Sequence, residues 1–161
     1  MKESKVFISK ITYYKKEDIR ILNACLSDWL SVPKILHFTE PRMTYPFNIK
    51  KWITLSYKEK NIETIIIKIE NWIVGHLSIK YEEDKNSAHF FHLIIDQAHL
   101  RKGYAKKLIN YAEKYLNNKI INEFTLDVVK KNQKAIQLYH SLGYKETKGR
   151  NKAIIKMEKN I

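Results

Sequence analysis

Hydrophobic residues recur along nearly the whole chain, and their spacing predicts the elements of its first half. Apolar residues at helical spacing predict a helix over residues 17–30. Runs rich in β-branched residues then predict three consecutive strands, over residues 62–70, 72–81 and 88–95. Because only short polar turns separate these strands, we expect them to form an antiparallel meander.

The rest of the first 60 residues is less regular. Residues 6–8 predict a short strand, and Asn48 is a suitable N-cap for a short helix over residues 49–57. All three prolines fall within residues 31–48, so this segment is expected to be a loop or a broken helix.

The second half alternates helices with strands. Residues 102–117 and 132–142 carry the apolar stripes of two helices, and residues 124–129 predict a strand between them. Residues 144–147 and 153–158 predict a final hairpin. A helix that joins two strands of one sheet implies a right-handed parallel crossover.

Together these elements predict one domain of the α/β (α+β) class. Its central sheet is expected to be mixed and mostly antiparallel, with one parallel β-α-β unit and flanking helices. The length of 161 residues agrees with a single domain.

Composition excludes several classes of protein. A hydrophobic share of 44% is ordinary globular material and argues against a disordered or collagen-like chain. With Cys25 as the single cysteine, an intrachain disulfide and a zinc site of several cysteines are excluded, and the histidines lack metal-ligand spacing. The apolar runs are too short to span a bilayer, and the N-terminus lacks the apolar core of a signal peptide. We therefore expect a cytoplasmic protein without a membrane partner.

The formal net charge of +13 raises the question of a polyanionic partner. Of the 30 cationic residues, 26 are lysines, and they are scattered among glutamates along the chain. A nucleic-acid binder more often gathers its basic residues on one face and reads bases with arginine. The scatter favours a solvated lysine-rich surface, whose field would attract a nucleic acid or a small phosphorylated cofactor.

Glycine is scarce, so the position of Gly103 is informative. It lies between a predicted strand and a predicted helix, in the string His99-Leu100-Arg101-Lys102-Gly103-Tyr104-Ala105. The first N–H groups of a helix lack partners, and the helix dipole favours an anion there. This pattern indicates a pyrophosphate cradle, although a plain helix start would look the same. The Walker and Rossmann glycine patterns are absent.

A second motif follows in the helix over residues 132–142. Asn132, Ala135 and Tyr139 are spaced so that they share one face, with Asn132 as N-cap and Gly143 just beyond the helix. A polar cap, a small residue and a phenol on one stripe suggest a groove for a slender ligand. The alternative is that Tyr139 packs in the core and Asn132 only caps the helix.

The two motifs together resemble those of the GNAT acyltransferase superfamily. The resemblance covers residues 62–158, and it departs from the family pattern at Leu100, where Gln or Arg is usual. The residues that carry it are Gly103 and Ala105 in the first motif, and Asn132, Ala135, Tyr139, Gly143 and Tyr144 in the second.

The resemblance implies an N-acetyltransferase that moves an acetyl group from acetyl-CoA to a primary amine of a small molecule or peptide. It implies direct attack in a ternary complex, with Tyr139 donating a proton to the departing thiolate and Asn132 lining the cofactor groove. The backbone of Leu93, Ile94 and Ile95 would hold the pantetheine arm. The pyrophosphate would be bound around Leu100, Arg101, Lys102, Gly103, Tyr104 and Ala105.

The general base is the open part of this mechanism. His89 and His92 lie on one predicted strand and titrate near neutrality, which makes either a candidate. Being three residues apart, they face opposite sides of a regular strand, so only one reaches the cleft unless a bulge intervenes. Some members of the family use no side-chain base.

The acceptor site is expected in residues 1–60, beside a cofactor-binding core over residues 62–158. The loop at 31–48 offers His37, Phe38, Glu40, Arg42, Tyr45 and Phe47, of which Glu40 could recognise a cationic amine. We expect a monomer or homodimer without a specific nucleic-acid partner. Two other readings stay open: a CoA-binding sensor without catalysis, and a basic nucleic-acid-binding module.

Overall fold

The computed structural model describes residues 4–149 and 151–161, which contain one sheet of seven strands. The strands are β1 Val6–Ile11, β2 Ile62–Ile69, β3 Trp72–Glu82, β4 Ser87–Ile95, β5 Glu123–Val129, β6 Lys145–Thr147 and β7 Ile154–Asn160. Their order in the sheet is β1-β2-β3-β4-β5-β7-β6, and every neighbouring pair is antiparallel except β4 and β5. The predicted mixed sheet with one parallel pair is confirmed.

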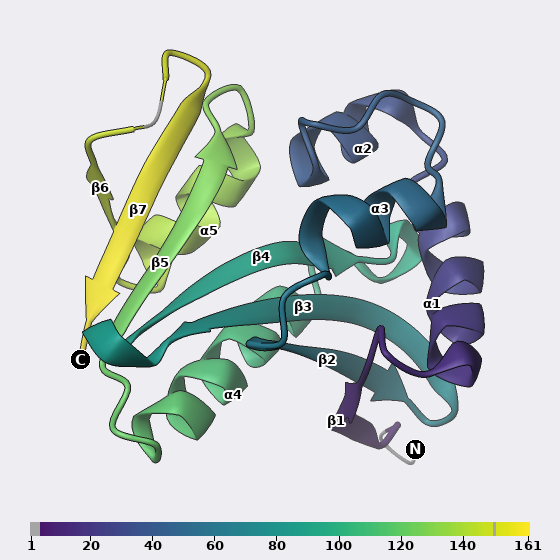
Figure 1. Cartoon of the computed structure of the whole chain (residues 1–161), viewed down its shortest axis with the longest axis horizontal. Coiled ribbons are helices and arrows are strands. Elements are labelled where there is room, and N and C mark those ends of the chain that lie inside the picture. The colour runs from purple at the N-terminus through teal and green to yellow at the C-terminus, as the bar shows by residue number, and fades with distance from the viewer. Residues whose placement is uncertain (1–3, 150) are drawn as a thin grey trace.

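Five α-helices cover the two faces of the sheet (Figure 1). They are α1 Lys16–Trp29, α2 Pro33–Thr39, α3 Ile49–Ser56, α4 Tyr104–Asn117 and α5 Gln133–Ser141. Residues of α1, α2 and α3 share one buried cluster, while α4 and α5 pack into another on the opposite face. No helix in the described ranges has the length and hydrophobicity needed to cross a bilayer.

The helix starts differ from the sequence prediction in an informative way. The helix predicted from residue 102 begins at Tyr104, because Arg101 and Gly103 adopt left-handed φ angles of 65° and 80°. The segment at 31–48 contains α2, which starts at Pro33, so the broken-helix alternative holds there. Proline suits a first helical turn because its missing N–H would lack a partner anyway.

Gly75 lets α4 lie close to the middle of the sheet. A Cβ at this position would come within 2.7 Å of both the Ile67 and the Ile95 side chains, and within 3.2 Å of Leu108 on α4. Close backbone approach is the usual reason for glycine inside a strand. Side chains of β2, β4 and α4 therefore pack closely around Gly75.

The sheet opens between β4 and β5. The two strands pair only where residues 87–90 meet residues 123–126, and beyond that point they diverge, as Figure 1 shows. The divergence leaves the β5-facing edge of β4 without a strand partner beyond Phe90. Exposed backbone groups of this kind need a partner from another source, such as a ligand.

A β-bulge lies in the same part of β4. His76 pairs with Ile94 and Ser78 with Phe91, so Leu77 alone faces the two residues His92 and Leu93. His92 has a left-handed φ of 52°, which is uncommon for a residue other than glycine. Beyond the bulge, the alternation of side chains between the two faces of the sheet is shifted by one residue.

Candidate active site

A cavity of about 210 Å³ occupies the opening between β4 and β5. It brings together the two sequence motifs, which are nearly 30 residues apart. Seven of the site residues predicted from the sequence line it: His92, Leu93, Ile95, Leu100, Ala105, Asn132 and Tyr139. The other lining residues are Phe38, Thr39, Leu77, Phe90, Phe91, Ile109, Asp127, Val128, Ala135 and Leu138.

At one end of the cavity, between Leu100 and Ala105, the chain turns into the N-terminus of α4, a geometry that favours an anion. The first bond of α4 runs from the Lys107 N–H to the Gly103 carbonyl at 3.0 Å, so the N–H groups of the preceding turn have no acceptor within the helix. A Cβ added at Gly103 would meet nothing within 4 Å, which shows that the space in front of the turn is open.

The charges around this turn fit a polyphosphate. Arg101, Lys102, Lys106 and Lys107 are all exposed, and the first turn of α4 carries no acidic residue. Cations and a helix N-terminus together favour a dianionic group. The residues present therefore fit the pyrophosphate of coenzyme A, and this fit rests mainly on backbone N–H groups, which Leu100 does not disturb.

Tyr139 stands on the wall of the cavity formed by α5. Its side chain is buried, its ring packs edge-on against Tyr144 at 6.0 Å, and burial raises the pKa of its hydroxyl. No side chain among the described residues hydrogen-bonds this hydroxyl, so it is available to a ligand. Asn132 caps α5 by accepting the Ala135 N–H at 3.4 Å and also faces the cavity.

The bulge places both candidate histidines on the same face of the sheet. Phe90 and Leu93 pack with the α4 cluster, whereas Phe91 packs with the α1–α3 cluster. His92 stacks on Trp52 at 3.8 Å, and His89 stacks on Phe91 at 6.4 Å. The regular strand expected from the sequence would have separated them, and the bulge, which the sequence left open, removes that separation.

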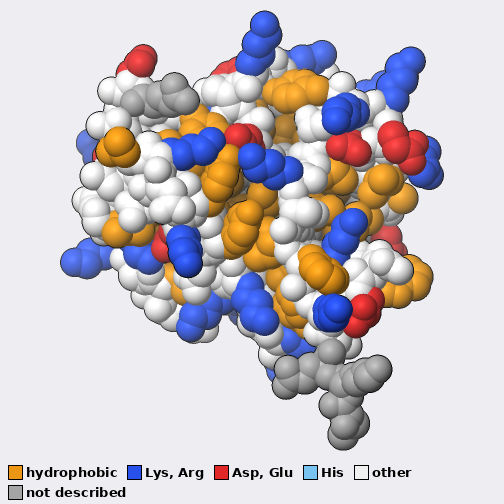
Figure 2. Space-filling view, turned by 90° about the horizontal axis from the view of Figure 1, so that it is seen from below, with side chains coloured by type: hydrophobic (Ala, Val, Ile, Leu, Met, Phe, Trp, Pro, Cys, Tyr) orange, Lys and Arg blue, Asp and Glu red, His pale blue; other side chains and the backbone are white. Residues whose placement is uncertain are grey.

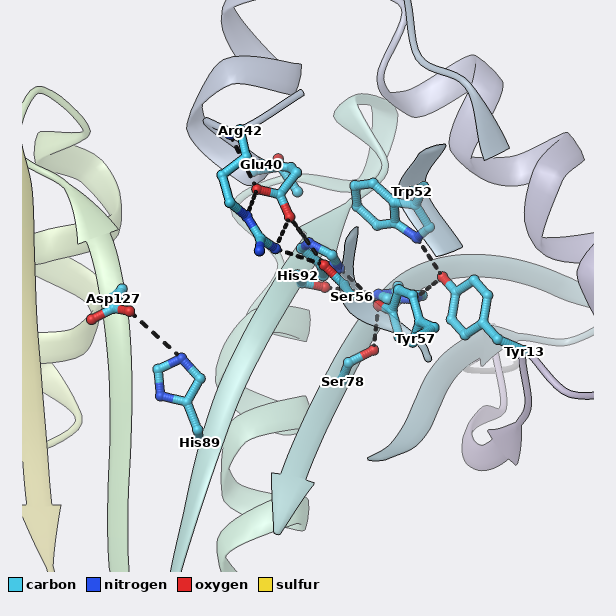
Figure 3. A network of polar contacts seen from close by, with 12 residues as sticks. Tyr13, Glu40, Arg42, Trp52, Ser56, Tyr57, Ser78, His89, His92 and Asp127 are labelled. Carbon is cyan, nitrogen blue, oxygen red and sulfur yellow. Dashed lines mark hydrogen bonds and ion pairs between the residues drawn. The ribbon is translucent and has the colours of Figure 1, made fainter. Parts of the chain in front are cut away.

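His92 has hydrogen bonds at both ring nitrogens (Figure 3). Its Nε2–H donates to Oε1 of Glu40 at 3.1 Å, because a carboxylate can only accept. Its Nδ1 then accepts the Tyr57 hydroxyl at 2.7 Å, and that hydroxyl also meets Ser78 at 2.7 Å. Both polar atoms of the ring are therefore turned into the protein.

Glu40 is a buried carboxylate with several partners. Arg42 donates to both of its oxygens, at 2.7 Å and 3.0 Å, and the Ser56 hydroxyl donates at 3.1 Å. Burial opposes ionisation, but the hydrogen bonds from His92 and Arg42 outweigh it and hold the pKa of Glu40 below its ordinary value. An incoming ammonium group would have to displace one of these partners, so the geometry does not favour the suggestion that Glu40 binds the amine.

His76 anchors the backbone of the bulge from the neighbouring strand. Its Nδ1–H donates to the His92 carbonyl at 2.7 Å, and its Nε2 accepts the Tyr13 hydroxyl at 2.8 Å. The Trp52 indole N–H donates to the same Tyr13 hydroxyl at 3.0 Å. Burial lowers the pKa of His76 to about 3, so the ring is neutral at physiological pH.

This burial predicts a stability that falls on mild acidification. The unfolded chain binds a proton at His76 near pH 6.5, whereas the folded chain resists it down to about pH 3, so stability is complete above 6.5 and is lost as the pH falls. The slope is roughly 1.4 kcal/mol per pH unit for one group. Burial also lowers the pKa of His92, which adds to the loss.

Urea unfolding at pH 7.5 and at pH 5.5 measures this effect before most carboxylates titrate. We expect the free energy of unfolding to be about 1.4 kcal/mol or more lower at pH 5.5. Replacing the exposed His140 with glutamine should leave the difference unchanged. Equal stability at the two pH values would show that these rings are not buried as neutral groups.

His89 lies where β4 and β5 are still paired, just before the two strands diverge, and its side chain is partly exposed. Its Nδ1 is 2.8 Å from the Thr125 hydroxyl, and its Nε2 is 3.8 Å from Oδ2 of Asp127, as drawn in Figure 3. Phe91 and Asp127, its neighbours on either side, both line the cavity. His92 itself lines the cavity, whereas His89 lies next to the cavity, outside the Glu40 network, and is the more exposed of the two histidines.

Several site residues escaped the sequence analysis. Asp127 and Leu138 line the cavity, and Tyr57 and Ser78 complete the contacts of His92. Of the residues proposed on the acceptor loop, Phe38 reaches the cavity, while the Tyr45 hydroxyl bonds the Ser31 carbonyl and Phe47 packs on Trp52. The sequence carried no local signal for these long-range contacts.

Comparison with known families agrees with this geometry. The model of the acetyltransferase (GNAT) family matches residues 24–144, a span that includes both motifs. The chain belongs to the GNAT family. The resemblance found in the sequence is therefore confirmed, and so is the predicted cofactor, since GNAT enzymes use acetyl-CoA. No curated protein sequence matches the chain.

Solved structures share the GNAT fold over almost the whole chain. A domain from Methanocaldococcus jannaschii has 22% identity and a TM-score of 0.80, covering 99% of this chain and 100% of its own. The PaiA N-acetyltransferase of Thermoplasma acidophilum, in complex with coenzyme A, has 20% identity and a TM-score of 0.75, with coverages of 98% and 99%. Spermidine N-acetyltransferase of Vibrio cholerae, with CoA and spermine, has 18% identity and a TM-score of 0.71, with coverages of 95% and 94%.

Two other classes of site find no support in this GNAT chain. Within residues 4–149 and 151–161, no group of three or more His, Cys, Asp and Glu side chains could hold a metal ion. Figure 2 shows Lys and Arg side chains spread over one face among Asp and Glu, rather than gathered into a stripe. Nucleic-acid binders usually show such a stripe.

Proposed function

We propose that this protein transfers an acetyl group from acetyl-CoA to a primary amine of a small molecule or peptide, by direct attack in a ternary complex. The observation that carries the proposal is one cavity lined by Leu100 and Ala105 of the turn before α4, by Tyr139 of α5 and by residues of β4. We further propose one domain, in which residues 1–60 build the acceptor side and residues 62–158 hold the cofactor.

The cofactor would lie along the opening between β4 and β5. The unpaired edge of β4 at Leu93, Ile94 and Ile95 offers backbone groups to the pantetheine arm. The turn from Leu100 to Ala105, with Arg101, Lys102 and Tyr104, offers N–H groups and charge to the pyrophosphate. Asn132 lines the groove opposite. When bound, acetyl-CoA supplies an activated acetyl thioester.

Tyr139 is proposed as the general acid. Its hydroxyl keeps its proton at neutral pH, because burial raises the pKa of the phenol. Tyr139 lines the same cavity as Leu93 and Ile95 of β4, which supports its hydroxyl as the donor of a proton to a leaving thiolate.

His89 is proposed as the general base, in preference to His92. The His89 side chain is 21% exposed and lies beside Phe91 and Asp127 of the cavity wall, whereas the His92 side chain is only 3% exposed and contacts Glu40 and Tyr57. His89 would accept a proton from the amine, directly or through water. The walls at Phe38 and Phe91 are apolar and would hold a carbon chain of the acceptor. A fold neighbour that acetylates spermidine supports an amine acceptor.

Replacing His89 with glutamine tests the base. We expect kcat to fall roughly 100-fold at pH 7, within the usual contribution of general acid–base catalysis. The dependence of kcat on pH should also change, because the proposed general base is gone. His140→Gln, at an exposed site, provides the matched control. An unchanged pH profile in His89→Gln would assign the proton to water or to the substrate.

The activity itself is tested by release of free CoA with a panel of amines. Turnover with polyamines or peptide amines is expected, and the acetylated product should appear in mass spectrometry. Tight CoA binding without turnover on any amine would favour a sensor over an enzyme. Salt-sensitive binding of DNA or RNA without CoA affinity would favour the nucleic-acid reading.

A further inference from the structure

The bulge residue of β4 is held by more contacts than packing alone requires. His92 has a left-handed backbone with a φ of 52°, which is unfavourable for a residue with a Cβ. Such a conformation persists only where the surroundings impose it. The contacts of His92 show what imposes it here.

Four different groups fix His92, and each acts on a different part of the residue. Glu40 accepts from Nε2, Tyr57 donates to Nδ1, and Trp52 stacks on the ring face at 3.8 Å. His76 donates to the backbone carbonyl at 2.7 Å. Neither the ring nor the backbone carbonyl of His92 can move without breaking a buried hydrogen bond.

Three of these four groups, Glu40, Trp52 and Tyr57, come from residues 1–60, the segment proposed to build the acceptor side. Glu40 follows α2, and Tyr57 follows α3, while the bulge belongs to the strand that faces the cofactor cavity. Ser78 and Thr64 extend the chain of hydroxyl groups behind Tyr57, at 2.7 Å and 2.9 Å. Figure 3 shows this network well separated from His89 and Asp127.

We propose that Glu40 and Tyr57 are positioning residues that act through His92, holding the β4 bulge so that its backbone N–H groups face the thioester carbonyl. The proposal rests on the proposed function, since it needs acetyl-CoA in the cavity. Neither residue touches the reacting atoms. Their effect is to fix the backbone at His92, which lines the cavity together with Leu93.

The charge of Glu40 is the sensitive part of this arrangement. The carboxylate accepts from His92, Arg42 and Ser56, and its side chain is 4% exposed. Charge-assisted hydrogen bonds of this kind are roughly twice as strong as neutral ones. Glu40→Gln keeps the shape of the side chain but weakens its hold on His92 and leaves Arg42 without its counter-charge.

The test compares Glu40→Gln and Tyr57→Phe with the control Glu17→Gln, which removes a charge from an exposed ion pair with Arg20. We expect kcat to fall roughly tenfold or more in both network variants, while the Kd for CoA changes less than about threefold. Infrared spectra of bound acetyl-CoA labelled with ¹³C at the carbonyl provide the direct readout. Wild type and Glu17→Gln should lower the carbonyl frequency more than the two network variants do.

Each result decides the proposal. An unchanged kcat and carbonyl frequency in either folded network variant would overturn it. If Glu40→Gln does not fold, Tyr57→Phe, which removes one hydroxyl, decides alone. A parallel loss of CoA affinity and stability would reduce the network to a structural role. If the wild type neither binds CoA nor turns over, the proposed function fails instead, and the two failures are thereby distinguished.

Discussion

Gly103→Glu is expected to weaken acetyl-CoA binding by a factor on the order of 100 or more. The new carboxylate would stand in the open space before the α4 N-terminus, where the pyrophosphate is proposed to bind. Two unit charges about 4 Å apart near a protein surface repel by roughly 4 kcal/mol. The side chain would also be held at a φ of 80°, which disfavours any residue with a Cβ. Calorimetric titration measures the loss.

Two further variants separate charge from strain. Gly103→Ala introduces the backbone strain without the charge, and it should lower affinity far less. Gly143→Glu places the same charge at a residue with a positive φ of 95°, just beyond the C-terminal end of α5. This variant should bind acetyl-CoA normally. Retained binding in Gly103→Glu would mean that the pyrophosphate lies elsewhere.

Tyr139→Phe is expected to lower kcat roughly 100-fold, because general acid catalysis usually contributes at least that factor. The affinity for CoA should stay nearly unchanged, since the ring still fills its place against Tyr144 and only the hydroxyl is lost. Steady-state kinetics together with calorimetry measure the two quantities separately.

The control for this variant is Tyr111→Phe, which removes an exposed hydroxyl on α4. It should have wild-type kcat. A comparable loss of kcat and of CoA affinity in Tyr139→Phe would show that the phenol has a structural role and that another group, or solvent, protonates the thiolate.

Most of the fold could be read from the sequence because its signals are local. Periodicity gave the helices and strands, and Asn48 and Asn132 cap α3 and α5 as predicted. The start of α4 was displaced by two residues, because the left-handed Arg101 carries no signal in its residue type. The two ligand motifs were recognisable because each is made of residues that lie close together in the sequence, one in the turn before α4 and one along α5.

The interior of the site was not predictable for the opposite reason. The contact between Glu40 and His92 joins residues 52 positions apart, and the bulge that orients His92 depends on how β3 and β4 pair. A strand pattern has no feature that marks one inserted residue. The role of Asp127 beside the cavity likewise depends on the divergence of β5 from β4.

The cavity between β4 and β5 is proposed to bind acetyl-CoA, and every role assigned to its residues depends on that binding. Calorimetric titration of the wild-type protein with acetyl-CoA, with ATP and NAD as controls, tests it most directly. We predict one site per chain, micromolar affinity and clear selectivity over both controls. A folded protein that does not bind acetyl-CoA, or binds ATP equally well, would show that this cavity is not an acetyl-CoA site.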